Sequence, residues 1–317
     1  MSNLPDPNFI LTREYRRFAE FCDACRRYRY IGLCYGSPGV GKTLSARHYT
    51  GWDRLAAIKP FTEAPLQEVH ELQGMCSILY TLGVTNTSSQ VARETASLRQ
   101  SLHYLRLEPL RREEEALLER VRRYELQREQ EREERLRQHD WLTGPLPEDP
   151  PRSEPTWSEI GFDYRRKRHQ IADPTTLMIV DEADRLRMTS LEQMRAIFDM
   201  GDIGLVLLGM PGLEKRLARY PQLYSRVGFV HEFRALQAQE VRTLLEQDWK
   251  PSEVTGSLAG ITDEEVVAAV VRITGGNFRL LHRLLSQVAR VMEINALSTV
   301  TRPVVEAARE TLVIGSA

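Results

Sequence analysis

The chain has 317 residues, of which 42% are hydrophobic and 27% are charged, enough for about two folded domains. Its 43 Lys and Arg residues balance 44 Asp and Glu residues. This balance excludes a nucleic-acid-binding protein whose whole surface is basic, but it does not exclude a local basic patch. The apolar runs are too short for a membrane helix, residues 1–6 lack a secretory signal pattern, and four cysteines are too few for a disulfide framework. We therefore expect a soluble, cytoplasmic protein without a membrane partner.

The apolar pattern along the first two thirds of the chain alternates between helices and strands. It predicts an amphipathic helix over residues 12–27, a buried strand over 30–35 and a helix over 42–49. Three more continuous apolar runs, at 76–82, 175–180 and 203–208, have the length of buried strands. Continuous apolar strands separated by helices predict a parallel sheet that is covered on both faces.

Cys22 and Cys25 lie within the first predicted helix, on its apolar side. A zinc site needs about four ligands, and no second pair with suitable spacing exists in the sequence. We therefore expect both cysteines to pack in the hydrophobic core.

A charged segment from about residue 100 to 157 has the composition of a helical insertion. Residues 111–138 contain nine Glu and nine Arg and favour a helix. Two interpretations stay open, a partner-binding arm or coiled coil and a solvated helix, and the lack of a sustained apolar heptad favours the second. A stiff proline-rich connector follows, with Pro145, Pro147, Pro150, Pro151 and Pro155.

From about residue 236 the pattern changes to helices alone, at 237–249, 262–273, 278–292 and 302–313. The sequence thus predicts two domains. Residues 1–235 form an α/β domain that carries the insertion at about 100–157, and residues 236–317 form a small helical domain.

One segment matches the phosphate-binding loop pattern G-x-x-x-x-G-K-[ST] in full: Gly36, Ser37, Pro38, Gly39, Val40, Gly41, Lys42 and Thr43. The glycines let several backbone N–H groups face an anion, and the helix that follows adds its positive end. Lys42 would neutralise the β- and γ-phosphates, and the Thr43 hydroxyl would hold Mg²⁺. The predicted nucleotide contacts run from Gly36 to Leu44, so the chain is expected to bind a nucleoside triphosphate such as ATP.

Asp181 and Glu182 follow the third apolar strand directly, at the edge of a parallel sheet where ligands bind. We predict that Asp181 orients the Mg²⁺ water shell and that Glu182 is the general base for an attacking water. On its own the pair could equally be a helix cap, but together with the phosphate loop it points to hydrolysis.

These motifs together resemble those of AAA+ ATPases, and more narrowly those of the transposition regulators TnsC and TniB and, distantly, phage Mu B protein. The resemblance covers residues 9–90 and 158–295. It rests on the phosphate loop and on four further stretches, at residues 9–12, 179–186, 204–209 and 223–228. It implies a P-loop NTPase fold, in which a parallel sheet is flanked by helices and the small all-helical domain is a lid.

The resemblance also implies roles for single residues. Arg226 matches the arginine finger that completes a neighbouring subunit's site, with Arg216 and Arg219 as rivals, and Arg279 matches the lid arginine called sensor 2. Met210 stands where the sensor 1 position usually carries a polar residue, so we expect slow, assembly-dependent ATP hydrolysis. Phe9, Ile10 and Leu11 are candidates for adenine contacts.

The resemblance further implies that ATP drives a homo-oligomer, a ring or a filament, onto double-stranded DNA, where it recruits a transposase together with a targeting factor. The best basic cluster for phosphate contacts is Arg165, Arg166, Lys167 and Arg168, with an ordinary exposed basic turn as the alternative. The polar loop at 85–89 is a second place to look for DNA contacts. Two other functions stay open: a STAND-like signalling or defence NTPase switch that acts through protein partners, and a small-molecule kinase.

Overall fold

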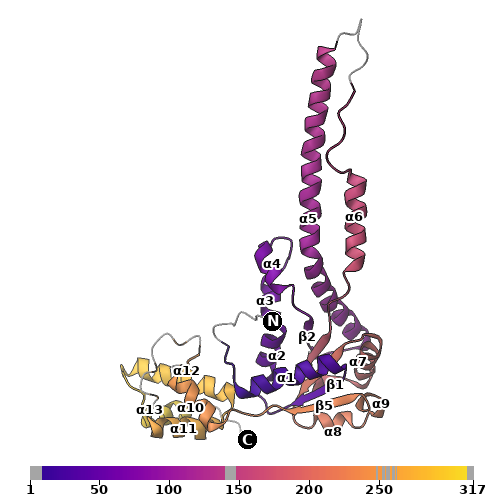
Figure 1. Cartoon of the computed structure of the whole chain (residues 1–317). Coiled ribbons are helices and arrows are strands. Elements are labelled where there is room, and N and C mark those ends of the chain that lie inside the picture. Colours follow the sequence, from indigo (N-terminus) through magenta and orange to yellow (C-terminus); the bar gives the residue numbers. More distant parts are fainter. Residues whose placement is uncertain are drawn as a thin grey trace. The chain divides into compact units, whose positions relative to one another are not determined.

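The computed structural model describes residues 9–139, 148–247, 249–251, 254, 258, 261 and 263–312, with elements labelled as in Figure 1. The predictions for residues 1–6, Pro145, Pro147 and the end of the last helix at 313 lie outside the described residues. The chain divides into two compact units. The main unit comprises Met1–Asp53, Cys76–Leu98 and Thr175–Ala317, and the insert unit comprises Arg54–Met75 and Arg99–Pro174.

The described part of the main unit contains a five-stranded sheet in the order β2-β3-β4-β1-β5, with every neighbouring pair parallel. Its strands are β1 (Ile31–Tyr35), β2 (Ser77–Thr81), β3 (Leu177–Asp181), β4 (Gly204–Gly209) and β5 (Val227–Glu232). The four predicted strands are confirmed. The edge strand β5 was missed because its residues alternate between half-buried and exposed, so it has no continuous apolar run.

The strand register brings three chain segments to one edge of the sheet. Tyr35 pairs with Gly209 at the ends of β1 and β4, and Thr81 pairs with Asp181 at the ends of β2 and β3. Because the strands are parallel, the loop after β1, the Asp181 carboxylate and the end of β4 face the same space.

Helix α1 (Arg13–Tyr28) packs against β1, β3, β4 and β5. The Thr12 side chain caps its first turn by accepting a hydrogen bond of 3.0 Å from the Tyr15 N–H. Phe18, Cys22 and Cys25 on its inner face are completely buried against the sheet, as predicted for the two cysteines.

Burial should also decide which thiols react. Burial raises the pKa of Cys25 to about 12 and raises those of Cys22 and Cys34 well above the usual range. Of the four cysteines, all of which the structure describes, Cys76 is partly exposed and the other three are buried. Because only the thiolate reacts, iodoacetamide at pH 8 is expected to label Cys76 alone in the native protein, and all four in urea. Mass spectrometry measures this, and native labelling of Cys25 as fast as that of Cys76 would contradict it.

Of the remaining main-unit helices, five follow the predicted pattern with shifted ends, and the three at Met188–Met200, Leu213–Leu217 and Pro221–Tyr224 were not predicted. These remaining helices are α2 (Lys42–Thr50), α7 (Met188–Met200), α8 (Leu213–Leu217), α9 (Pro221–Tyr224), α10 (Ala238–Glu246), α11 (Glu264–Thr274), α12 (Phe278–Ile294) and α13 (Arg302–Glu310). The last four helices share a separate hydrophobic cluster that includes Val241, Val270, Leu284 and Val305, each completely buried. A domain boundary at residue 235 stays a prediction, consistent with this cluster.

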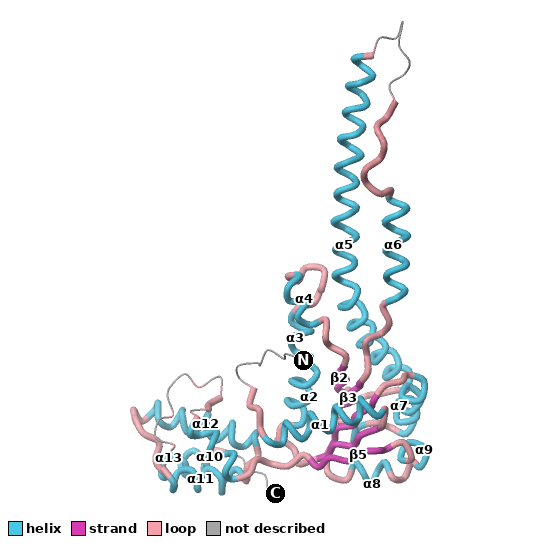
Figure 2. The backbone as a smooth tube through the Cα atoms, viewed as in Figure 1, coloured by secondary structure: helices cyan, strands magenta, loops and turns pink. Residues whose placement is uncertain are grey.

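The insert unit is helical, as Figure 2 shows. Helix α5 (Ser88–Gln138) starts in the main unit and runs without interruption for 51 residues, with Pro109 inside it. The short helices α3 (Trp52–Ala57) and α4 (Leu66–Leu72) and the helix α6 (Trp157–Gln170) were not predicted. Helix α6 starts at a reciprocal capping box between Thr156 and Glu159. The cluster of cations from Arg165 to Arg168 therefore lies in a helix and not in a turn.

No helix in the part of the chain that the structure describes is both long and apolar enough to cross a membrane.

Candidate functional site

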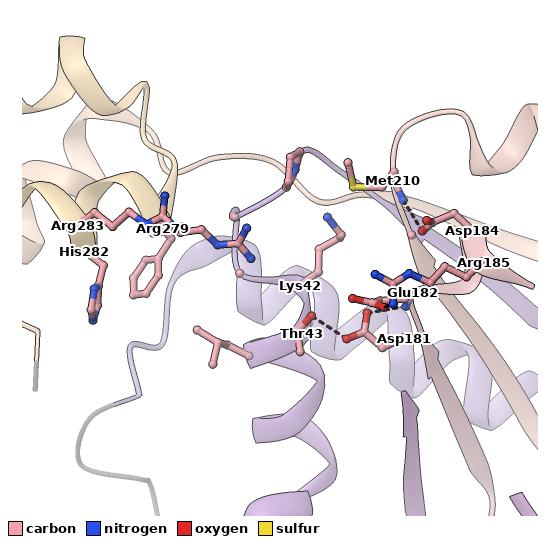
Figure 3. A pocket seen from close by; sticks show the side chains of 16 residues that line it. Lys42, Thr43, Asp181, Glu182, Asp184, Arg185, Met210, Arg279, His282 and Arg283 are labelled. Atoms are coloured by element: carbon pink, nitrogen blue, oxygen red, sulfur yellow. Dashed lines mark hydrogen bonds and ion pairs between the residues drawn. The ribbon is translucent and has the colours of Figure 1, made fainter. Parts of the chain in front are cut away.

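A cavity of about 550 Å³ opens where the sheet edge, the loop after β1 and helix α12 meet (Figure 3). The structure brings together nine of the sequence-predicted residues around it: Pro38, Gly39, Gly41, Lys42, Thr43, Leu44, Asp181, Glu182 and Arg279. Gly36 and Ser37 lie at the base of the same loop, where their carbonyl groups bond Lys42. Val40 is buried behind it.

The glycines of this loop are required by its backbone. Gly39 and Gly41 have φ angles of 83° and 110°, in the left-handed region that side chains disfavour. A Cβ at Gly36 would lie 2.2 Å from the Phe233 carbonyl oxygen. No side chain caps the first turn of α2, which begins at Lys42, so its N–H groups can serve an anion.

The Lys42 ammonium points back into the loop. Its Nζ donates to the Gly36 carbonyl at 2.6 Å and to the Ser37 carbonyl at 3.0 Å. Burial lowers the pKa of Lys42, and the positive charge of Arg279 adds to that shift, whereas Asp181 opposes it. A phosphate at this site would therefore give a partly desolvated cation its anionic partner.

The buried carboxylate of Asp181 at the end of β3 and the exposed hydroxyl of Thr43 in α2 form a pair of oxygen ligands. The Thr43 hydroxyl donates to Asp181 Oδ2 at 2.7 Å, and Asp181 Oδ1 accepts from the Glu182 N–H at 2.9 Å. Among the described residues no group of three or more His, Cys, Asp or Glu side chains could hold a metal ion by itself. The pair fits Mg²⁺, which is typically held by one or two protein oxygens, phosphates and water.

Glu182 faces the cavity from a strained backbone. Its φ of 57° and ψ of 37° are left-handed, a conformation that costs a non-glycine residue on the order of 1–3 kcal/mol and that clusters at functional sites. Its carboxylate forms an ion pair with Arg185, and both side chains are more than a third exposed. Pairs of this kind contribute about 0–1 kcal/mol, so Glu182 can leave Arg185 at little cost.

The segment that leads into α12 holds the loop directly. The Arg279 N–H donates to the Gly39 carbonyl at 2.9 Å, and the Asn277 amide donates to the Pro38 carbonyl at 2.8 Å. Figure 3 shows the Arg279 side chain extending from α12 toward Lys42. Lys42 and Arg279 are thus two of the four described Lys and Arg side chains that line the cavity, together with Arg185 and Arg283.

The structure does not bring Arg226 to the cavity of its own chain. Its guanidinium bonds both Asp199 carboxylate oxygens, at 2.5 and 2.9 Å. Its rival Arg216 bonds the backbone carbonyls of Asp184 and Leu186 in the same chain, which is a structural role.

The predicted DNA-contacting residues are not among those that line the cavity. Arg166 and Lys167, on α6 of the insert unit, both pair with Asp163. In the polar loop at 85–89, Asn86 is 1% exposed and bonds the Arg185 carbonyl at 3.1 Å, so it braces the turn after β3 rather than facing a ligand.

Six of the described residues that line the cavity received no role from the sequence: Asp184, Arg185, Gly209, Phe278, His282 and Arg283. Asp184 and Arg185 belong to the short helix η1 (Ala183–Arg185), directly after Asp181 and Glu182. Their position directly after a predicted buried strand could have marked both residues as part of the site. Of this turn, only Asp181 and Glu182 received roles from the sequence.

A second cavity of about 450 Å³ shares Gly41, Leu44, Phe278 and His282 with the first. Phe9 and Ile10, two of the three proposed base-contacting residues, line it. Leu11 does not line it and is half exposed.

Two comparisons with known proteins both point to a nucleotide-binding protein. A family model described as "AAA domain" matches residues 25–217. A Staphylococcus aureus protein described as a potential ATP-binding protein is 37% identical over 316 residues, which cover 97% of each chain.

Solved structures resemble the fold. A mutant of RuvB from Thermotoga maritima aligns with a TM-score of 0.50 and 13% identity, over 94% of this chain and 68% of that one. The Aeropyrum pernix ORC1 protein, solved in complex with DNA, aligns with a TM-score of 0.49 and 20% identity, over 97% of this chain and 67% of that one.

Proposed function

This chain belongs to the AAA domain family, and we propose that it is a Mg²⁺-dependent ATPase that assembles on duplex DNA and regulates transposition. The predicted fold class, a P-loop α/β sheet flanked by helices, is confirmed. The observation that carries the proposal is the convergence of Lys42, Thr43, Asp181 and Glu182 on one cavity.

The phosphates would bind to the loop by electrostatics. Its N–H groups and the first turn of α2 face the anion, and Lys42 exchanges two carbonyl partners for the β- and γ-phosphate oxygens. Thr43 and Asp181 would hold Mg²⁺, which when bound neutralises charge that develops on the phosphates. The base would enter the second cavity beside Phe9 and Ile10.

Hydrolysis would use Glu182 as the general base. A water oxygen forms a bond to the γ-phosphorus, the bond from that phosphorus to the bridging oxygen breaks, and Glu182 accepts the water proton. ADP and phosphate are the products. Arg279 would stabilise the γ-phosphate from its own chain.

Arg226 supports assembly into a homo-oligomer. It lies away from its own cavity, and its side chain is 33% exposed. We propose that it acts on the nucleotide of a neighbouring chain in a ring or filament, which would make turnover slow in the monomer.

The resemblance to TnsC and TniB supports the finer part of the proposal, in which the assembly recruits a transposase and a targeting factor in the cytoplasm. Arg165, Arg166, Lys167 and Arg168 would contact DNA phosphates without reading bases. Arg166 and Lys167 would first have to leave Asp163, so Arg165 and Arg168 are the stronger candidates.

Electron micrographs with duplex DNA and a non-hydrolysable ATP analogue test this assembly. Rings or filaments are expected with both ligands, and the Arg226→Ala variant should not form them. Replacing Arg165, Arg166, Lys167 and Arg168 together with Ala should weaken binding to all DNA sequences at least about 10-fold near 0.1 M salt. The control removes four exposed arginines of α5: Arg122, Arg123, Arg132 and Arg137.

Two outcomes would redirect the proposal. ATP binding without any effect of DNA would favour the signalling or defence switch. Transfer of the γ-phosphate to an added small molecule instead of water would favour the kinase.

A further inference from the structure

A third carboxylate lies beside those of Asp181 and Glu182 in the first cavity. Asp184 follows them within the turn after β3 and lines the cavity together with Glu182 and Lys42 (Figure 3). The proposed hydrolysis steps give Asp184 no role. A carboxylate beside a phosphate site is unfavourable, because both groups are negatively charged, so its presence there calls for a function.

The Asp184 carboxylate is held in place by the end of β4. Its Oδ1 accepts a hydrogen bond of 3.3 Å from the Met210 N–H. A Cβ at Gly209 would lie only 2.9 Å from the same oxygen, so glycine permits this close approach. The Arg216 guanidinium fixes the turn from behind by bonding the Asp184 and Leu186 carbonyls.

This anchoring occupies one carboxylate oxygen. Within the described residues, Asp184 Oδ2 has no hydrogen-bond donor. Met210, the next side chain at the end of β4, is a thioether and offers no strong hydrogen bond. Beside the end of β4, the polar side chain that faces the cavity is therefore that of Asp184, which the Met210 N–H holds there.

A water that attacks a phosphoryl group needs two acceptors to be well oriented. One removes its proton, and the other holds its second O–H so that a lone pair faces the phosphorus. Glu182 and Asp184 project into the cavity from the same turn and can serve one water in this way.

We propose that Asp184 is the water-positioning residue of the hydrolysis reaction, an inference that rests on the ATPase function proposed above. Asp184 Oδ2 accepts a hydrogen bond from the attacking water while Glu182 takes the proton that is lost. Asp184 itself neither gains nor loses a proton in this step.

The test compares turnover with binding. Asp184→Ala should lower kcat about 50-fold, while the Kd for a non-hydrolysable ATP analogue changes less than about twofold. Affinity for ADP with aluminium fluoride and Mg²⁺, which mimics the transition state, should fall by a factor similar to that of kcat.

Two further variants separate positioning from folding. Asp184→Asn keeps an oxygen for the Met210 N–H but replaces the second acceptor by a donor, so the same loss is expected. Adding Met210→Asn to Asp184→Ala supplies an amide oxygen at the strand end and should restore at least about fivefold of the lost rate. A purely structural role would show no such rescue.

Each contrary result has its own meaning. If the wild type hydrolyses ATP and Asp184→Ala and Asp184→Asn do so equally well, this inference fails and the proposed function stands. An equal loss of analogue affinity and kcat would also overturn it, because Asp184 would then shape the site and not the water. A wild type that binds ATP but never hydrolyses it, even when assembled, overturns both.

Discussion

Replacing Lys42 with Ala is expected to weaken ATP binding by at least about 100-fold. A charge-assisted hydrogen bond to phosphate contributes about 1.5–3 kcal/mol, and Lys42 can make two of them. Its present partners are the Gly36 and Ser37 carbonyls, which ordinary water can replace after the substitution.

Calorimetry with ATP and Mg²⁺ measures this effect. Lys215→Ala, which removes an exposed lysine of α8, is the matched control and should bind like the wild type. The loss should be smaller for ADP, because Lys42 is expected to contact the γ-phosphate as well as the β-phosphate. Wild-type affinity in Lys42→Ala would remove the nucleotide site from this cavity.

Changing Glu182 to Gln should lower kcat about 1,000-fold and leave the Kd for ATP within about threefold. Gln keeps the size of the side chain but cannot accept the proton, and general bases contribute about 10²–10⁴-fold to rates. It also removes the ion pair with Arg185, a loss of at most about 1 kcal/mol between exposed partners.

Phosphate release under single-turnover conditions measures this rate. Glu20→Gln, an exposed substitution on α1, is the control. Assemblies on DNA should persist longer with Glu182→Gln, because bound ATP is no longer consumed. If both variants turned over at the wild-type rate, the base would have to be another residue.

The fold and the phosphate site were predictable because both depend on local patterns. Strands β1 to β4 are buried on both faces and appear in the sequence as continuous apolar runs. The phosphate loop combines glycines that the backbone requires with Lys42 and Thr43 at fixed spacing.

Other features depend on contacts between distant segments, which no local pattern reveals. Asp184 gains its place through the Met210 N–H, 26 residues further along the chain. Helix α6 was missed because its buried face is small: Ile160 is the one buried residue among those described in it. The partner of Arg226 is likewise 27 residues away, at Asp199.

The bond between the Arg279 N–H and the Gly39 carbonyl separates two properties of one residue. The main chain of Arg279 fastens α12 to the loop, while its side chain carries the positive charge. Almost any substitution at this site therefore changes the charge and preserves the attachment, and only proline, which lacks the N–H, removes the bond. Substitutions at this position can thus change the charge of the cavity while α12 stays bonded to the loop.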